Sequence, residues 1–261
     1  MVWLDHFGDP LLNPQLPELI AIAKAYGVGT GVSVNPGSLS SEMAHRLLSS
    51  GLDHLHFSLD GIDEETYRYY RGPAADYARA VARIEEFLRL KQAASVSRPF
   101  VVIAMVCMLR TQPQIDEFRR RWTRPGVDQV MLKPYCAFNG DVDNSGEPPL
   151  PRPPGPLSPC YFPWSSVTVM SDGRVVPCCY DYDGLFVLGD LSRQTIVDIW
   201  NGEAMRRLRQ SHLSGHYEEN QLCRNCVDRR LRPDVKTLCK QTGSALKTTL
   251  RSAYDLDASY R

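Results

Sequence analysis

The sequence has no excess of charge of either sign and no long apolar run. Lys and Arg together number 30, as do Asp and Glu, so the formal net charge is +0. A neutral chain offers no electrostatic attraction to nucleic acid or to an anionic membrane surface. No apolar stretch approaches the ~20 residues that a transmembrane helix needs. The first residues also lack the basic segment and apolar stretch of a secretory signal, so we expect a cytoplasmic protein with neither nucleic-acid nor membrane partners.

Several widespread binding and catalytic motifs are missing as well. There is no P-loop and no G-x-G-x-x-G, which argues against the common modes of nucleoside-triphosphate and dinucleotide binding. The six histidines form no HExxH or similar ligand pattern, so no metal site built on histidine is indicated. No cysteine precedes Cys107.

Eight cysteines remain as the residues most able to carry chemistry. In a reducing compartment they favour metal binding or redox chemistry over a disulfide framework. Cys107 ends an apolar run that starts at Val101, and we expect it to be a small buried residue. The same interpretation is open for Cys136 and Cys239.

Four other cysteines have the spacing of a metal site: Cys160-x17-Cys178, then x44, then Cys223-x2-Cys226. A hairpin predicted over residues 167–176 would bring the first two together. Thiolates suit tetrahedral zinc and iron–sulfur clusters equally, so the spacing leaves the metal open. Cys179 adjoins Cys178, and because neighbours on a strand point to opposite faces we expect only one of the two as a ligand. A thioredoxin-type dithiol is an alternative for the CxxC, but that motif opens a helix after a strand, and no strand is predicted before Leu222.

Strand-like and helix-like segments alternate through the first half. Strands are expected at residues 2–7, 28–34, 54–60, 100–107 and 128–134. Between them apolar residues recur at helical spacing, and Ser40 is placed to cap a helix that Gly51 ends. Strands separated by helices predict crossover units and a parallel sheet.

The strand at residues 54–60 alternates strictly between polar and apolar residues. Its apolar side chains would pack under helices, while the polar ones would face the other side of the sheet. Both faces of a doubly wound sheet carry helices, so its strands are usually apolar throughout. A polar inner face fits a barrel that encloses a cofactor, and an edge strand with one solvated face is the alternative.

Seven prolines lie between Pro148 and Pro159, where neither a helix nor a central strand can form. We expect a linker over residues 138–159, which separates a first domain at 1–137 from a second at 160–227. The second domain is predicted to hold the hairpin and a helix from Thr195 to Leu208. A polar tail follows at 228–261.

The second domain combines the closing CxxC with characteristic segments at residues 160–164, 171–179, 188–191 and 198–201. With these segments it resembles the SPASM or shorter twitch domain of radical S-adenosylmethionine (SAM) enzymes. The resemblance implies that Cys160, Cys178, Cys223 and Cys226 hold an auxiliary 4Fe–4S cluster.

The first domain resembles the barrel of the same family. Gly8, Asp9 and Pro10 stand where the family has its G-G-E-P element, whose backbone holds the amino group of SAM. Ser33 and Asn35 stand where the family has a T-N-G type turn, and the segment from Phe57 to Gly61 is typical of the family. The resemblance implies that these residues bind SAM: Gly8, Asp9, Pro10, Ser33, Asn35, Ser58 and Asp60. It further implies an α/β fold, a partial (β/α)6 barrel.

The family's CxxxCxxC loop, which binds the SAM-reducing cluster, has no counterpart in the sequence. In the family this loop follows the first barrel strand, upstream of the G-G-E-P element. Residues 2–7 would be the second strand, so we expect a barrel that lacks its first strand and a chain truncated at its N-terminus, inactive alone as written.

In the family, SAM cleavage yields a 5′-deoxyadenosyl radical that modifies peptides, proteins or small molecules, with an electron donor such as flavodoxin or ferredoxin. Whether this chain is itself an enzyme is left open by the missing motif. The alternatives are a non-catalytic iron–sulfur protein for electron transfer or binding, and a structural zinc module.

Overall fold

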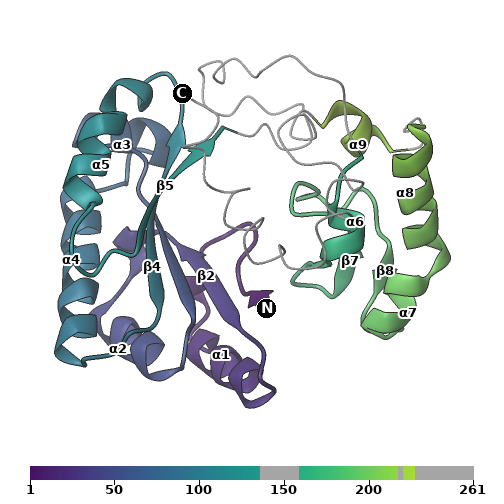
Figure 1. The fold of residues 1–261 in the computed structure, drawn as a ribbon, viewed down its shortest axis with the longest axis horizontal. Coiled ribbons are helices and arrows are strands. Elements are labelled where there is room, and N and C mark those ends of the chain that lie inside the picture. Colours follow the sequence, from purple (N-terminus) through teal and green to yellow (C-terminus); the bar gives the residue numbers. More distant parts are fainter. Residues whose placement is uncertain (136–158, 217–219, 227–261) are drawn as a thin grey trace, which may run out of the picture. The chain divides into compact units, whose positions relative to one another are not determined.

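The computed structural model describes residues 1–135, 159–216 and 220–226, which fall into two compact units (Figure 1). The first unit is residues 1–135, and the second comprises the described residues from Pro159 onward. Most of the predicted linker, the predicted tail, Cys136 and Cys239 lie outside the described residues. The domain boundaries at 137 and 160 therefore remain predictions.

Five parallel strands form the sheet of the first unit, in the order in which they occur along the chain. They are β1 (Val2–Trp3), β2 (Thr30–Val34), β3 (His54–Ser58), β4 (Phe100–Cys107) and β5 (Gln129–Pro134). The predicted parallel sheet is thus confirmed. The strand expected at residues 2–7 is shorter, because after Leu4 the carboxylate of Asp5, and no longer the backbone, accepts the next amide of β2, that of Ser33.

Helices follow the strands and lie on one side of the sheet (Figure 1). They are α1 (Leu16–Ala25), α2 (Ser41–Ser49), α3 (Glu64–Arg71), α4 (Tyr77–Ala93) and α5 (Ile115–Trp122), with short 3₁₀ helices at Pro10–Leu12, Pro36–Ser38 and Gln112–Gln114. When each parallel strand pairs with the next in sequence, right-handed crossovers place all helices on the same face. This is the winding of a barrel segment, as expected, and it differs from a doubly wound sheet.

The alternation predicted in β3 is present. Leu55, Phe57 and Leu59 are fully buried on the helix side, where the Phe57 ring packs against Phe87 of α4 with 5.6 Å between centroids. His54, His56 and Ser58 are half-buried. The helix-free face of the sheet therefore carries polar side chains along β3.

The helix boundaries follow local signals in the sequence. The Ser40 hydroxyl accepts the Met43 amide and starts α2, as predicted. Asp63 and Asp76 cap α3 and α4 in the same way. Gly51 follows α2 with φ +82°, a conformation that favours glycine.

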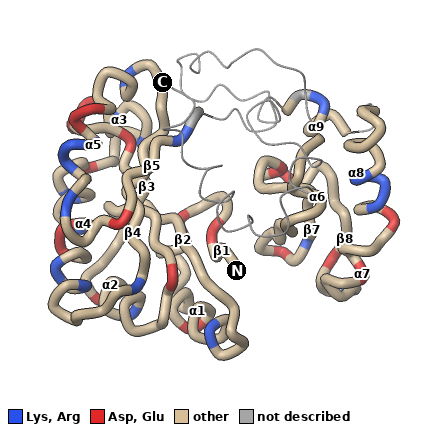
Figure 2. Tube along the Cα trace, viewed as in Figure 1, with Lys and Arg blue, Asp and Glu red and all other residues tan. Residues whose placement is uncertain are grey.

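Charges of both signs are interspersed along α4 and α5 (Figure 2). Some pair within one helix, as Arg83–Glu86 at 2.7 Å, and Arg124, just beyond α5, pairs with Glu85 of α4 at 3.3 Å. These helices therefore present mixed charge.

The second unit contains the predicted hairpin, in which β6 (Thr168–Val169) pairs antiparallel with β7 (Arg174–Val176). A third strand, β8 (Gly189–Asp190), extends this sheet and was not predicted. The helices are α6 (Phe162–Ser165), α7 (Ile196–Asn201), α8 (Glu203–Ser214) and α9 (Gln221–Asn225).

The prediction of a single helix from Thr195 to Leu208 is wrong, because the chain forms two helices there, α7 and α8, separated by Gly202. Its extended backbone, with ψ 168°, ends one helix and starts the next. A Cβ at this position would lie 2.9 Å from the Asp198 carbonyl oxygen, so the break needs glycine.

Across both units, no helix that the structure describes combines the length and the apolar composition needed to cross a bilayer.

A tight contact between β1 and β2 yields a stability prediction. A Cβ added to Gly31 would lie 2.7 Å from the Trp3 ring, whereas one added to Gly29 would meet nothing closer than 3.7 Å. We expect Gly31→Ala to lower the free energy of unfolding by about 1–3 kcal/mol, as overpacking does. Gly29→Ala, the matched control, should stay within about 0.5 kcal/mol of the parent. Urea denaturation followed by fluorescence measures both, and equal stability of the two variants would contradict the contact.

Candidate functional site

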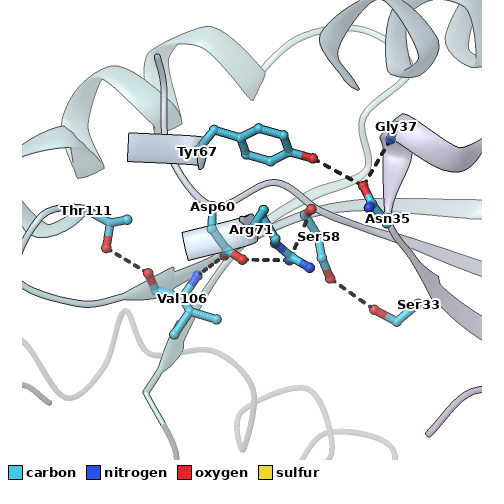
Figure 3. Close-up of polar contacts among 9 residues, drawn as sticks. All are labelled: Ser33, Asn35, Gly37, Ser58, Asp60, Tyr67, Arg71, Val106 and Thr111. Atoms are coloured by element: carbon cyan, nitrogen blue, oxygen red, sulfur yellow. Dashed lines mark hydrogen bonds and ion pairs between the residues drawn. The ribbon is translucent and has the colours of Figure 1, made fainter. Parts of the chain in front are cut away.

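The carboxyl ends of β1, β2 and β3 bring several predicted SAM-binding residues together. The Ser33 amide donates to the Asp5 carboxylate at 2.9 Å. The hydroxyls of Ser33 and Ser58 lie 3.3 Å apart and are hydrogen-bonded (Figure 3). Both predicted serines therefore face the same side of the sheet as neighbours.

Asp60 is a buried residue just beyond the carboxyl end of β3, where it connects several neighbouring groups (Figure 3). Its carboxylate accepts the Val106 amide at 2.7 Å and pairs with the Arg71 guanidinium at 2.6 Å. Arg71 also donates to the Ser58 carbonyl oxygen at 3.3 Å. Asp60, expected to line the SAM site, therefore has both oxygens engaged by the protein and acts by orienting Arg71.

Thr111, a buried residue that follows β4, stabilises the backbone next to Asp60. The Thr111 hydroxyl donates to the Val106 carbonyl oxygen at 2.7 Å and accepts the Met108 amide at 2.8 Å. It thereby fixes the turn after β4 against the end of that strand, where the Val106 amide donates to Asp60.

Asn35 caps the 3₁₀ helix that follows β2. Its Oδ1 accepts the Gly37 amide at 3.1 Å and the Tyr67 hydroxyl at 3.2 Å (Figure 3). Burial raises the pKa of Tyr67, so this hydroxyl keeps its proton. With Oδ1 engaged, Asn35 offers its amide N–H groups to a ligand.

The Gly8-Asp9-Pro10 segment starts the 3₁₀ helix after β1. Gly8 has φ +109°, so glycine is needed for its backbone conformation. One Asp9 oxygen accepts the Leu11 amide at 3.1 Å. The other, Oδ2, is buried with no hydrogen-bond partner among the described residues, and Arg71 Nε is in the same condition.

Asp5 is a titratable residue that the sequence analysis did not single out. Burial raises its pKa to about 6, against the opposing effects of the Ser33 amide and the Lys133 charge. Burial also lowers the pKa of Lys133 on β5. Its position in the sequence could have indicated it, because Asp5 closely follows a strand and the next strands of the sheet also end in polar residues.

The histidines of β3 pack as uncharged rings. Burial and the Lys133 charge lower the pKa of His56 to about 3. Its ring meets Trp3 edge-on with 4.7 Å between centroids. His54 likewise lies near Phe100, at 5.6 Å.

The β4–β5 side of the same face carries an apolar cluster. Val102, Ala104 and Met131 form a buried cluster with Phe100 against it. Strand register places Val102 beside His56 and Ala104 beside Ser58. The face is therefore polar along β1–β3 and apolar around Val102, Ala104 and Met131, while Lys133 adds a positive charge near the carboxyl end of β5. Such a mixed face suits a ligand with polar and apolar parts.

In the second unit three other cysteines lie near enough to the half-buried Cys178 to affect its pKa. Burial raises the pKa of Cys178 well above its usual value, and the nearby Cys179, Cys223 and Cys160 raise it further as like charges. Two of the four predicted ligands thus lie near Cys178. No group of three or more His, Cys, Asp or Glu side chains able to hold a metal ion is found within the described ranges.

The fourth predicted ligand, Cys226, ends α9, and its amide donates to the Cys223 carbonyl oxygen at 3.4 Å. Asn220 starts this helix by accepting the Cys223 amide at 3.1 Å. Buried Asp181 fixes the loop after Cys179 by accepting the amides of Leu185 and Phe186 at 2.8 and 2.9 Å. Side-chain contacts thus fix the backbone just before Cys223 and just after Cys179.

Cys107 differs from these cysteines. It is buried at the end of β4, and burial raises its pKa to about 11. Its predicted character as a small buried residue is confirmed.

Two relatives and one solved structure show what the chain is similar to. A tungsten-containing aldehyde ferredoxin oxidoreductase cofactor-modifying protein of Pyrococcus furiosus is 21% identical, over 89% of this chain and 74% of its own length. PqqA peptide cyclase of Streptomyces rochei is 36% identical, over 30% of this chain and 20% of its own length. Apart from the P. furiosus protein, the curated relatives compared are matched over less than a third of their length.

The crystal structure of anSMEcpe with bound AdoMet aligns with a TM-score of 0.56 at 13% identity. The alignment covers 97% of this chain and 80% of anSMEcpe. At that identity the likeness concerns the fold alone. The fold expected from the sequence, an α/β barrel segment, is confirmed by it.

Two family models match the chain. Residues 4–120 match the radical SAM superfamily, and residues 160–227 match the SPASM iron–sulfur cluster-binding domain. Together the two segments span well over half of the sequence and coincide with the two sites described above. The chain therefore belongs to the radical SAM superfamily and carries a SPASM domain.

Proposed function

We propose that this chain binds SAM on the polar side of its sheet and an auxiliary 4Fe–4S cluster in its second unit. It would do so as part of an enzyme that modifies a peptide or a small molecule. The observation that carries the proposal is the match of residues 160–227, which contain Cys160, Cys178, Cys223 and Cys226, to an iron–sulfur cluster-binding domain.

The donor set of the second unit fits an iron–sulfur cluster. Several thiolates in a buried site repel one another, and iron bound to the sulfurs compensates that charge. Cys160, Cys178, Cys223 and Cys226 are the proposed ligands. A cluster bound there would accept or pass on one electron at a time.

The first unit offers matching groups to the charged ends of SAM. Asp9 Oδ2 is buried without a hydrogen-bond partner among the described residues, which suits an ammonium group. Arg71, held by Asp60, suits a carboxylate. Ser33, Ser58 and the amide of Asn35 add neutral hydrogen-bonding groups, and Gly8 and Pro10 set the backbone beside Asp9.

The substrate class and electron donor rest on the relatives. The names of two of them state action on a cofactor and on a peptide, respectively. A modified peptide or cofactor-like molecule is therefore proposed as the product, with a flavodoxin or ferredoxin as electron donor.

The cluster proposal predicts the effect of removing individual sulfurs. Anaerobic reconstitution with iron and sulfide should give broad absorbance near ~400 nm, as for cysteine-ligated clusters. Cys178→Ala or Cys223→Ala should abolish most of it, because each removes one of the proposed ligands. Cys107→Ala, in the other unit, should keep it. Full cluster content in all four ligand variants would refute the assignment, while loss in Cys179→Ala alone would move the ligand to Cys179.

SAM binding depends in this proposal on the Asp9 charge. Asp9→Asn can still cap the 3₁₀ helix through its side-chain oxygen but loses the anion. We expect SAM to bind about tenfold more weakly or worse, since hydrogen bonds to charged groups are worth about 1.5–3 kcal/mol. Calorimetric titration measures this. The exposed Asp116→Asn is the control, and equal affinity in both variants would exclude Asp9 from the site.

The radical-forming step needs a SAM-reducing cluster, and the sequence contains no CxxxCxxC motif. Within residues 1–135 the only cysteine is the buried Cys107. We therefore expect these 261 residues, supplied with SAM and dithionite, to form no 5′-deoxyadenosine by chromatography. Product above a no-protein control would show that the chain generates the radical by itself.

A further inference from the structure

Helix α8 carries no cysteine, yet it contacts two of the three segments that supply proposed cluster ligands. Met205 and Leu208 pack with Cys223 in one buried cluster. Further along the helix, His212 Nδ1 accepts the backbone amide of Cys160 at 3.2 Å. Cys160 and Cys223 are far apart in sequence, and α8 contacts both of them.

The contacting residues lie on one face of α8. Met205, Leu208 and His212 follow the spacing i, i+3 and i+7, which places side chains on a common side of a helix. Arg209, next to them, donates to the Pro163 carbonyl oxygen at 2.8 Å. The segment from Cys160 to Trp164 is thus attached to α8 at two points.

The hydrogen bond also defines the state of His212. A ring nitrogen that accepts an amide cannot carry a proton, so the neutral imidazole holds its proton on Nε2. The ring is 1% exposed and meets Trp164 edge-on at 6.3 Å. Its position is therefore set by packing as well as by the hydrogen bond.

The geometry points to His212 as a positioning residue for the auxiliary cluster. By accepting the Cys160 amide, it fixes the backbone from which that thiolate reaches the iron and keeps this N–H directed at the imidazole instead of at sulfur. Partners one step removed from a metal orient its ligands and tune its reduction potential. This inference rests on the proposed function, since it presupposes a cluster on Cys160.

Three variants separate the acceptor atom from the ring. His212→Phe keeps an aromatic ring against Trp164 but removes the acceptor. His212→Gln keeps an acceptor oxygen but removes the ring. His216→Phe, at an exposed histidine just beyond α8, is the matched control. Each full-length variant is reconstituted anaerobically, checked by circular dichroism, and titrated for midpoint potential with electron paramagnetic resonance of the reduced cluster.

We expect His212→Phe to shift the midpoint potential to more positive values and to alter the resonance spectrum. The reason is that the released amide can donate to sulfur, and such hydrogen bonds favour the reduced cluster. His212→Gln and His216→Phe should match the parent. If His212→Phe does not fold, His212→Leu replaces it with the same expectation.

An unchanged potential in His212→Phe, or a shift in His212→Gln as large as in His212→Phe, would overturn the inference and leave only a packing role. Failure of the parent protein to take up a cluster would instead refute the proposed function. The two failures are therefore distinguishable.

Discussion

The second unit depends on sulfurs that can be ionised together only if a cation joins them. Cys178 is half-buried, its pKa is raised by desolvation, and three other cysteines lie close enough to raise it further. A buried charge without compensation costs several kcal/mol, so such thiols stay protonated unless a metal binds. The contacts of Asn220 and Asp181 hold the backbone of this region. Protonated thiols are small apolar side chains that this region can accommodate, whereas thiolates would need the metal that the SPASM domain is proposed to bind.

In the first unit the fold likewise gathers polar groups, here oxygen and nitrogen atoms on one face of the sheet. Sequential parallel strands place the helices on one face, so the polar side chains of β3 are left on the other. There Asp60 takes the Val106 amide and the Arg71 guanidinium, which leaves Arg71 oriented at the strand ends. The apolar cluster on β4 and β5 completes a face suited to a ligand of mixed character.

Local rules predicted much of this architecture. The alternation in residues 54–58, the Ser40 cap and the hairpin at 167–176 all follow from short-range patterns, and all are confirmed. The strand predicted over 54–60 ends two residues earlier, and Leu59 and Asp60 are both buried. The single helix over 195–208 was wrong because apolar periodicity continues through Gly202 while the backbone does not. Strand β8 has only two residues, too few to show a period.

The site was less predictable because its key contacts join distant residues. Asp60 was expected to line the SAM site, but its partners Arg71 and Val106 come from other elements and occupy both of its oxygens. The proposed positioning role of His212 depends on its hydrogen bond with Cys160, which lies far away in the sequence. The family resemblance identified the cysteines, whereas the supports around them required the structure.

Mössbauer spectroscopy of the protein reconstituted with ⁵⁷Fe tests most directly whether the sulfurs of the second unit hold one cluster. The predicted spectrum assigns the bound iron to a single four-iron centre with sulfur ligation. Iron present only as isolated ions, or a protein that binds zinc and no iron, would contradict it.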